Sequence, residues 1–142
     1  MRNNKGVTLV ELLVVIVVMG IIAGFAIPAV GGIISNANRD AVLNDAIQIE
    51  NAARLYCSST TDETFCGNST TAGTELDLVT TSAASTNFLA EYIDGITYGG
   101  TGYTTATVQW LGGEWVVELY DGEFAFGPLN PTDALRDDVT KS

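Results

Sequence analysis

The sequence contains no histidine, and only two of its 142 residues are cysteine. Without histidine, the chain lacks the side chain that most often acts as a general acid or base near neutral pH and most often binds transition metals. Cys57 and Cys66 alone do not complete a tetrahedral zinc site. No nucleophile with a nearby base and no paired-carboxylate motif stands out either. We therefore expect no catalytic residues, no metal site and no cofactor.

Positive charge is also scarce. Six Lys and Arg residues stand against 17 Asp and Glu residues, which gives a formal net charge of −11. Two of the six cations, Arg2 and Lys5, come before the first apolar segment. The rest of the chain has few groups that could neutralise phosphates, so direct nucleic-acid binding is not expected. Such an acidic balance is typical of a protein surface exposed to solvent.

The longest apolar run extends from Val7 to Val30 and contains one charged residue, Glu11, and one proline, Pro28. As a helix, this run would be roughly 36 Å long, enough to cross a hydrocarbon core of about 30 Å. A carboxylate inside a membrane helix is unfavourable, so Glu11 requires an explanation.

Two simple interpretations explain residues 1–30 only in part. A cleaved secretory signal peptide has a shorter apolar region, followed by a polar boundary at its cleavage site. A plain signal anchor, with Arg2 and Lys5 kept inside, accounts for everything except Glu11.

The segment KGVTLVELLVV, residues 5–15, resembles the prepilin signature of type IV pilins and pseudopilins. In that family a membrane peptidase cuts after the glycine, here Gly6, and methylates the new amino terminus, here Val7. The family usually has Phe at this position, so Val7 is a departure. The resemblance implies that Glu11 of one subunit pairs with the Val7 amine of a neighbour during filament assembly. Opposite charges attract strongly in such an apolar setting.

Three residues weaken the helix in one window: Gly20, Gly24 and Pro28. Pro28 cannot donate a hydrogen bond to the carbonyl of Gly24, and glycine is a poor helix former. A kink in a membrane helix is one consequence. In related filaments the corresponding segment unwinds, so the resemblance implies local melting between Gly20 and Pro28 on assembly.

Beyond this run, apolar residues recur at spacings of three and four, as on one face of a helix. They are Val42, Ala46, Ile49, Ala53 and Tyr56. Gly31 and Gly32 could end a helix, but the resumed periodicity favours one helix over about 8–56. On its polar side, Glu50 and Arg54 form a weakly favourable i, i+4 pair.

Cys57 and Cys66 follow this helix directly. In an exported chain their default interpretation is one disulfide, with two free thiols as the alternative. Residues 67–86 are small and polar and predict a surface connection without core residues. Residues 87–93, NFLAEYI, predict a short helix.

Three segments, 105–111, 114–120 and 124–126, alternate between apolar and polar residues. Gly112-Gly113 and Asp121-Gly122 separate them and favour two-residue hairpin turns. The turns predict that Trp110 pairs with Trp115 and Leu119 with Phe124. Separately, residues 96–98 are expected to add an edge strand. An aromatic ligand platform is the alternative to core packing. Both turns place the same set on one apolar face: Ala106, Val108, Trp110, Trp115, Val117, Leu119, Phe124 and Phe126.

These elements predict an α+β fold, and the resemblance implies that it is the type IV pilin fold. A long N-terminal helix with a protruding apolar half would pack its second half on a C-terminal antiparallel meander of three or four strands. We expect a cleaved leader at 1–6, a transmembrane or filament-core half at 7–30 and a globular head at 31–142. The head divides into a helix at 33–56, a loop at 57–95, a sheet at 96–126 and an irregular surface tail at 127–142.

The resemblance implies a structural subunit of a type IV pilus-like extracellular filament. The subunit would span the cytoplasmic membrane once before assembly and lie at the bacterial cell surface afterwards. Its partners would be identical or related subunits, a prepilin peptidase and a membrane assembly platform. One alternative is a pseudopilin of a type II secretion or competence (DNA-uptake) system. A more remote one is a membrane-anchored binding module.

Overall fold

The computed structural model describes residues 6–61, 63–68, 71–79, 89, 92–93 and 102–142. The chain divides into two compact units, Met1–Asn36 and Ala37–Ser142.

One helix, α1 (Leu9–Ser59), contributes to both units. It continues through Pro28 and through Gly31 and Gly32, so the paired glycines do not end it. Proline removes only one backbone hydrogen bond here, and the apolar and amphipathic patterns on either side both favour helix. The first unit consists almost entirely of this helix, and its large apolar side chains from Val7 to Ile34 are 48–81% exposed.

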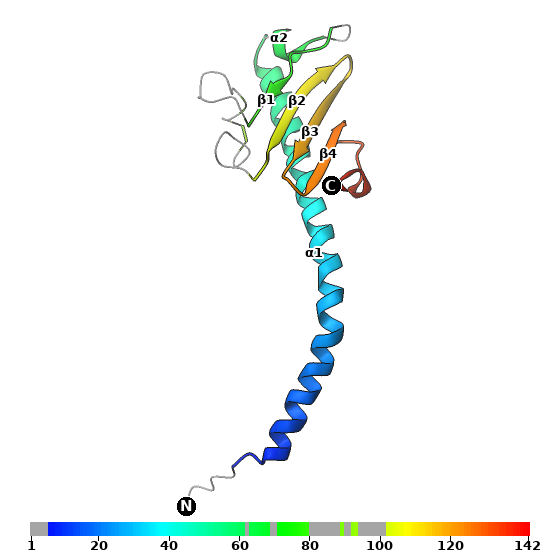
Figure 1. Cartoon of the computed structure of the whole chain (residues 1–142). Helices are drawn as coiled ribbons and strands as arrows, with labels where there is room; N and C mark the ends of the chain where they lie inside the picture. The colour runs from blue at the N-terminus through cyan, green and yellow to red at the C-terminus, as the bar shows by residue number, and fades with distance from the viewer. Residues whose placement is uncertain (1–5, 62, 69–70, 80–88, 90–91, 94–101) are drawn as a thin grey trace, which may run out of the picture. The chain divides into compact units, whose positions relative to one another are not determined.

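In the second unit, five antiparallel strands form a sheet in the order β1-β2-β3-β4-β5. The strands are β1 (Leu76–Asp77), β2 (Thr105–Leu111), β3 (Glu114–Tyr120), β4 (Phe124–Leu129) and β5 (Thr140–Lys141). Figure 1 shows β2, β3 and β4 running side by side next to the C-terminal part of α1. The α+β architecture is therefore the expected one, with two short edge strands in addition to the meander.

The first hairpin has the predicted register, with Trp110 opposite Trp115 and Leu111 opposite Glu114. The predicted register of the second hairpin is wrong by two residues, because Leu119 lies opposite Phe126 rather than Phe124. The carboxylate of Asp121 causes the longer loop by accepting hydrogen bonds from the backbone N–H groups two and three residues later. A shift of two keeps every side chain on its predicted face.

Gly127 allows β4 to continue beyond a bulge in its pairing with β3. Its φ is +84°, and a Cβ at this position would lie 2.0 Å from the carbonyl oxygen of Val117. Only glycine fits there, because the backbones approach closely and φ is positive. The pairing shifts from Leu119–Phe126 to Val117–Leu129 across this position.

The core of the second unit lies between one face of α1 and the apolar face of the sheet. The helix contributes Val42, Ala46, Ile49, Ala52 and Ala53, all at most 4% exposed. The sheet contributes the predicted apolar face with Trp110 only partly buried; its buried members are Ala106, Val108, Trp115, Val117, Leu119, Phe124 and Phe126. The alternation in sequence thus identifies the buried face.

Two expectations about the connecting segments were wrong. Residues 67–86 do contribute to the core, since Leu78 is buried next to β1. The tail from Gly127 is not an irregular surface segment: it completes β4, forms β5 and buries Pro131 and Val139. The predicted helix at 87–93 and edge strand at 96–98 fall mainly outside the described residues, although Leu89 and Ile93 are buried.

A disulfide joins Cys57, in the last turns of α1, to Cys66, at the end of α2 (Glu63–Cys66). The two Cα atoms are 5.6 Å apart, and neither cysteine is free. Phe65 is buried beside this bridge and its ring lies 5.3 Å from that of Trp115, so the bridge holds a core residue in place.

We expect the double variant Cys57→Ser, Cys66→Ser to lose about 2–3 kcal/mol of unfolding free energy, the value for closing a short loop in the unfolded chain. Urea unfolding of the full chain in detergent micelles measures the loss. Adding reductant to the wild type should reproduce it, whereas reductant should leave the variant unchanged. Equal stability of both proteins would show that the bridge is dispensable.

Candidate functional site

The N-terminal start of α1 is a capping box formed by Thr8 and Glu11. The Thr8 hydroxyl accepts a hydrogen bond from the backbone N–H of Glu11 at 3.3 Å. In return, Oε2 of Glu11 accepts from the Thr8 backbone N–H at 2.8 Å and from its hydroxyl at 2.9 Å. The backbone N–H groups of Thr8 and Glu11, which have no partner within the helix, are therefore both hydrogen-bonded, each to the side chain of the other residue.

The resemblance predicted only an assembly role for Glu11 and not this capping role, although the sequence carries the capping pattern. Thr8-x-x-Glu11 before an apolar run is the S/T-x-x-E pattern of a helix start. Both hydrogen bonds from Thr8 end on Oε2, and no contact of Oε1 occurs among the described residues. The carboxylate thus has one oxygen engaged in its own helix and one oxygen free.

The expected cleavage point, between Gly6 and Val7, lies outside the helix. Residues 6–8 have no helical or strand structure, and both Gly6 and Val7 are exposed. An exposed peptide bond outside regular secondary structure is what a peptidase requires of a substrate.

The helix-weakening residues Gly20, Gly24 and Pro28 all lie within helical backbone in the isolated chain. A Cβ at either glycine would meet nothing within 4 Å. Neither glycine is therefore required by packing within this chain, and local melting on assembly stays a prediction.

By length and composition, α1 is the one helix in the described part of the chain that could cross a membrane. The 18-residue window of greatest hydropathy has no side chains buried inside the chain. Large apolar surfaces of this kind are covered by lipid or by protein partners. The apolar half of α1 is therefore a candidate membrane span.

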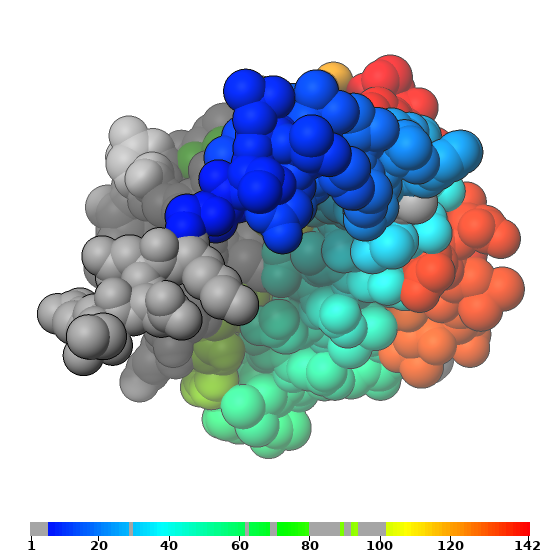
Figure 2. Space-filling view, turned by 90° about the horizontal axis from the view of Figure 1, so that it is seen from below, coloured from blue at the N-terminus to red at the C-terminus, as the bar shows by residue number. Residues whose placement is uncertain are grey.

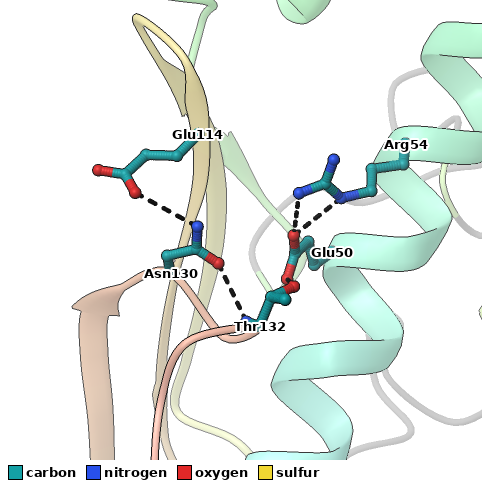
Figure 3. A network of polar contacts seen from close by, with 5 residues as sticks. All are labelled: Glu50, Arg54, Glu114, Asn130 and Thr132. Atoms are coloured by element: carbon teal, nitrogen blue, oxygen red, sulfur yellow. Dashed lines mark hydrogen bonds and ion pairs between the residues drawn. The ribbon is translucent and has the colours of Figure 1, made fainter.

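In the second unit, a buried carboxylate joins α1 to the segment after β4. Glu50 is 1% exposed, and Figure 3 shows its two oxygens pointing to different partners. Oε2 accepts a hydrogen bond from the Thr132 hydroxyl at 2.7 Å, and Oε1 is ion-paired with the half-exposed Arg54. Sequence periodicity predicted only the Arg54 pair, because a partner 82 residues away leaves no local signal.

The same network continues to the sheet. Asn130 accepts a hydrogen bond from the Thr132 backbone N–H at 3.0 Å and donates one to Glu114 of β3 at 3.3 Å. Figure 3 shows these residues forming a chain of contacts from β3 to α1.

Two other carboxylates of α1 make contacts distant in sequence. Asp40 forms a two-bond ion pair with Arg136, at 2.5 and 2.8 Å, and Figure 2 shows the C-terminal segment lying against this cyan part of α1. Asp45 accepts a hydrogen bond from the hydroxyl of half-buried Tyr103 at 2.6 Å. Burial, this hydrogen bond and the Asp45 charge raise the pKa of Tyr103 above its usual value of 10.0.

The aromatic side chains of the sheet pack on one another and on the core. The rings of Trp110 and Trp115 lie 5.3 Å apart, and Trp115 is 3% exposed. The Trp110 indole N–H donates to the carbonyl of Asn68 at 3.0 Å. Among the described residues, no three His, Cys, Asp or Glu side chains come together as metal ligands would. The arrangement in this unit is that of a packed core.

Replacing Glu50 with alanine should lower the unfolding free energy by about 1–3 kcal/mol, because Thr132 and Arg54 lose their acceptor. Glu50→Gln keeps an acceptor for Thr132 and should lose less. Glu118→Ala removes an exposed carboxylate of β3 and is the matched control. The role of Glu50 would be refuted by an alanine variant as stable as this control.

The raised Tyr103 pKa makes stability depend on pH in the alkaline range. Above pH 10 the unfolded chain loses the phenol proton while the folded chain keeps it, so stability falls as pH rises. Tyr103→Phe should therefore flatten the fall in unfolding temperature above pH 10, compared with the wild type. Tyr120→Phe provides the control, and equal slopes for wild type and Tyr103→Phe would contradict the assignment.

The first 27 residues match the family model described as "Prokaryotic N-terminal methylation motif". Curated relatives carry the name type II secretion system core protein G. The relative from Klebsiella michiganensis is 38% identical over 55 residues, 39% of either chain. That from Vibrio cholerae is 38% identical over 56 residues, 39% of this chain and 38% of the relative. That from Escherichia coli is 35% identical over 54 residues, 38% of this chain and 37% of the relative.

The matched part thus covers about two fifths of the length of these relatives. No solved structure matches the chain significantly. The motif, the capping box and the exposed apolar helix coincide in the same N-terminal segment. The chain therefore carries the prepilin-type methylation motif of the type IV pilin and pseudopilin family.

Proposed function

We propose that the chain is a structural subunit of a pilus-like filament, and specifically a pseudopilin of a type II secretion system. The observation that carries the proposal is the methylation motif, which leads directly into a helix whose apolar side chains stay exposed as far as Ile34. Water is an unfavourable environment for such a surface. Lipid covers it before assembly, and the helices of neighbouring copies cover it in the filament.

Processing supplies the charge that assembly uses. Cleavage after Gly6 creates an amine on Val7, which a peptidase of the family methylates. The free Oε1 of Glu11 accepts this amine from a neighbouring copy, while Oε2 keeps the helix capped through Thr8. One side chain thus fixes both the start of its own helix and the axial position of the next subunit.

The relatives favour a pseudopilus over a pilus. The sequence alone suggested a pilus subunit first and a pseudopilin second, whereas the relatives are named as type II secretion proteins. Their similarity lies within 54–56 residues, so it concerns α1 far more than the sheet. The sheet unit then forms the outer surface of the filament, where its acidic charge meets solvent.

Other proteins complete the proposed system. A prepilin peptidase removes residues 1–6, and a membrane assembly platform extracts each subunit from the bilayer. The sequence has no glycine-rich loop ending in lysine and serine or threonine, which would bind nucleotide phosphates, so a separate motor supplies the energy.

Mass spectrometry of the protein purified from its host should show a mature chain that begins with N-methylated Val7. Gly6→Ala should block processing, because the peptidase recognises the glycine. A purified chain that retains Met1 or Gly6 would refute the assignment.

Replacing Glu11 with glutamine should reduce the amount of assembled filament by roughly tenfold or more, because the neighbour's amine loses its buried counter-charge. Glutamine still accepts the cap hydrogen bonds, so membrane levels should be unchanged. Thr8→Val tests the cap separately.

Deleting the gene separates the two kinds of filament. A pseudopilin should be needed for protein export into the medium, whereas a pilus subunit should be needed for surface fibres. Loss of fibres with normal export would overturn the pseudopilin assignment and leave the filament role intact.

Normal assembly of the Glu11→Gln variant would overturn the proposed role of Glu11.

A further inference from the structure

Arg39 differs from the other cations that follow the leader. Arg54, Arg136 and Lys141 each form an ion pair within the chain, with Glu50, Asp40 and Glu123 respectively. Arg39 has no ion pair or hydrogen bond among the described residues, and its Nε is buried without an acceptor. A buried donor without a partner is rare in a folded protein and is unfavourable.

The helix around Arg39 offers no acid at the positions it could reach. Side chains three and four residues away lie on the same face of a helix, and none of these four positions is acidic: Ser35, Asn36, Val42 and Leu43. The adjacent Asp40 is occupied by Arg136, and Asp45 by Tyr103. Arg54, in contrast, has Glu50 four residues before it.

The charge of the whole chain makes an unpaired arginine important between copies. The formal side-chain charge changes from −11 to −13 once Arg2 and Lys5 leave with residues 1–6. Copies packed side by side therefore repel, unless cations meet carboxylates at their contacts. Apart from Asp137, whose charge already acts on Arg136 of its own copy, four exposed carboxylates have no ion pair or hydrogen bond among the described residues: Glu63, Glu75, Glu118 and Asp133.

We propose that Arg39 binds one of these four carboxylates on a neighbouring copy of the chain. The inference rests on the proposed filament function and adds a second charged contact between subunits, at the sheet unit. A guanidinium can form two parallel hydrogen bonds with a carboxylate, commonly through Nε and one terminal nitrogen. No polar contact holds Arg39 in its present position, so turning Nε toward a neighbour breaks no hydrogen bond.

The position of Arg39 in the sequence fits this contact. It stands five residues after Ile34, where the exposed apolar stretch of α1 ends, and just inside the second unit, which begins at Ala37. When the apolar parts of neighbouring helices pack together, the next residues of α1 come close to adjacent subunits. A lipid phosphate near the end of the membrane span is the competing partner for the same charge.

The test compares Arg39→Asp with Lys141→Asp in full-length chains expressed in the host. Lys141 is the matched control, because it is an exposed cation already paired within its own copy. The readout is the ratio of sheared filament to membrane-bound subunit. Arg39→Asp should lower this ratio by about tenfold, and the control should change it little. The unfolding temperature in detergent should not change.

Charge exchange identifies the partner. Arg39→Asp is combined in turn with Glu63→Arg, Glu75→Arg, Glu118→Arg and Asp133→Arg, and one combination should restore assembly. Failure of all four, normal assembly of Arg39→Asp, or a lowered unfolding temperature would overturn the proposal. Loss of the membrane-bound pool would instead indicate a lipid phosphate as the partner of Arg39 and would also overturn the proposal.

If the wild type assembles and depends on Glu11 while Arg39→Asp has no effect on assembly, this inference alone fails. If the wild type forms no filament, the proposed function fails as well.

Discussion

The central constraint is that the two halves of one continuous helix, α1, need different surroundings. Up to Ile34 its large apolar side chains are exposed on every side. From Val42 onward most apolar residues lie on one stripe, which the sheet buries, while Leu55 stays exposed. Burying apolar area is the main favourable term in folding and association. The second half of α1 obtains it within the chain, whereas the first half obtains it only from lipid or from other molecules. The second half of α1 therefore stabilises the fold, and the first half provides the surface for association.

Carboxylates attach the buried half of α1 to the rest of its unit. Asp40, Asp45 and Glu50 bind Arg136, Tyr103 and Thr132, residues 58 to 96 positions away in sequence. Apolar packing alone tolerates sliding of a helix over a sheet, whereas polar contacts with defined partners fix one position. The segment after β4 takes part in two of these three contacts, which explains why it is ordered and partly buried rather than a loose tail.

Sequence patterns predicted those features of the fold that depend on residues close together in the chain. The helix stripe, the apolar face of the sheet and the first hairpin follow from side-chain periodicity and from the Gly112-Gly113 turn. The predicted register of the second hairpin was wrong because the Asp121 side chain competes with the tight turn for backbone N–H donors. Burial of Glu50 and Leu78 could not be predicted, because it depends on segments distant in sequence. The capping box follows from the Thr8-x-x-Glu11 pattern, whereas the resemblance accounts for Glu11 only as an assembly residue.

The capping box has a consequence for the timing of events at the membrane. Its two partners, Thr8 and Glu11, both lie after the expected cleavage point, and α1 begins only at Leu9. Removing residues 1–6 would therefore take away no part of the helix and none of the hydrogen bonds of the capping box. In the proposed function, cleavage moves the terminal amine to Val7 and leaves the start of α1 and its capping box in place. Under the proposed function, cleaved subunits can therefore accumulate in the bilayer with the start of their helix already formed, until an assembly platform draws on them.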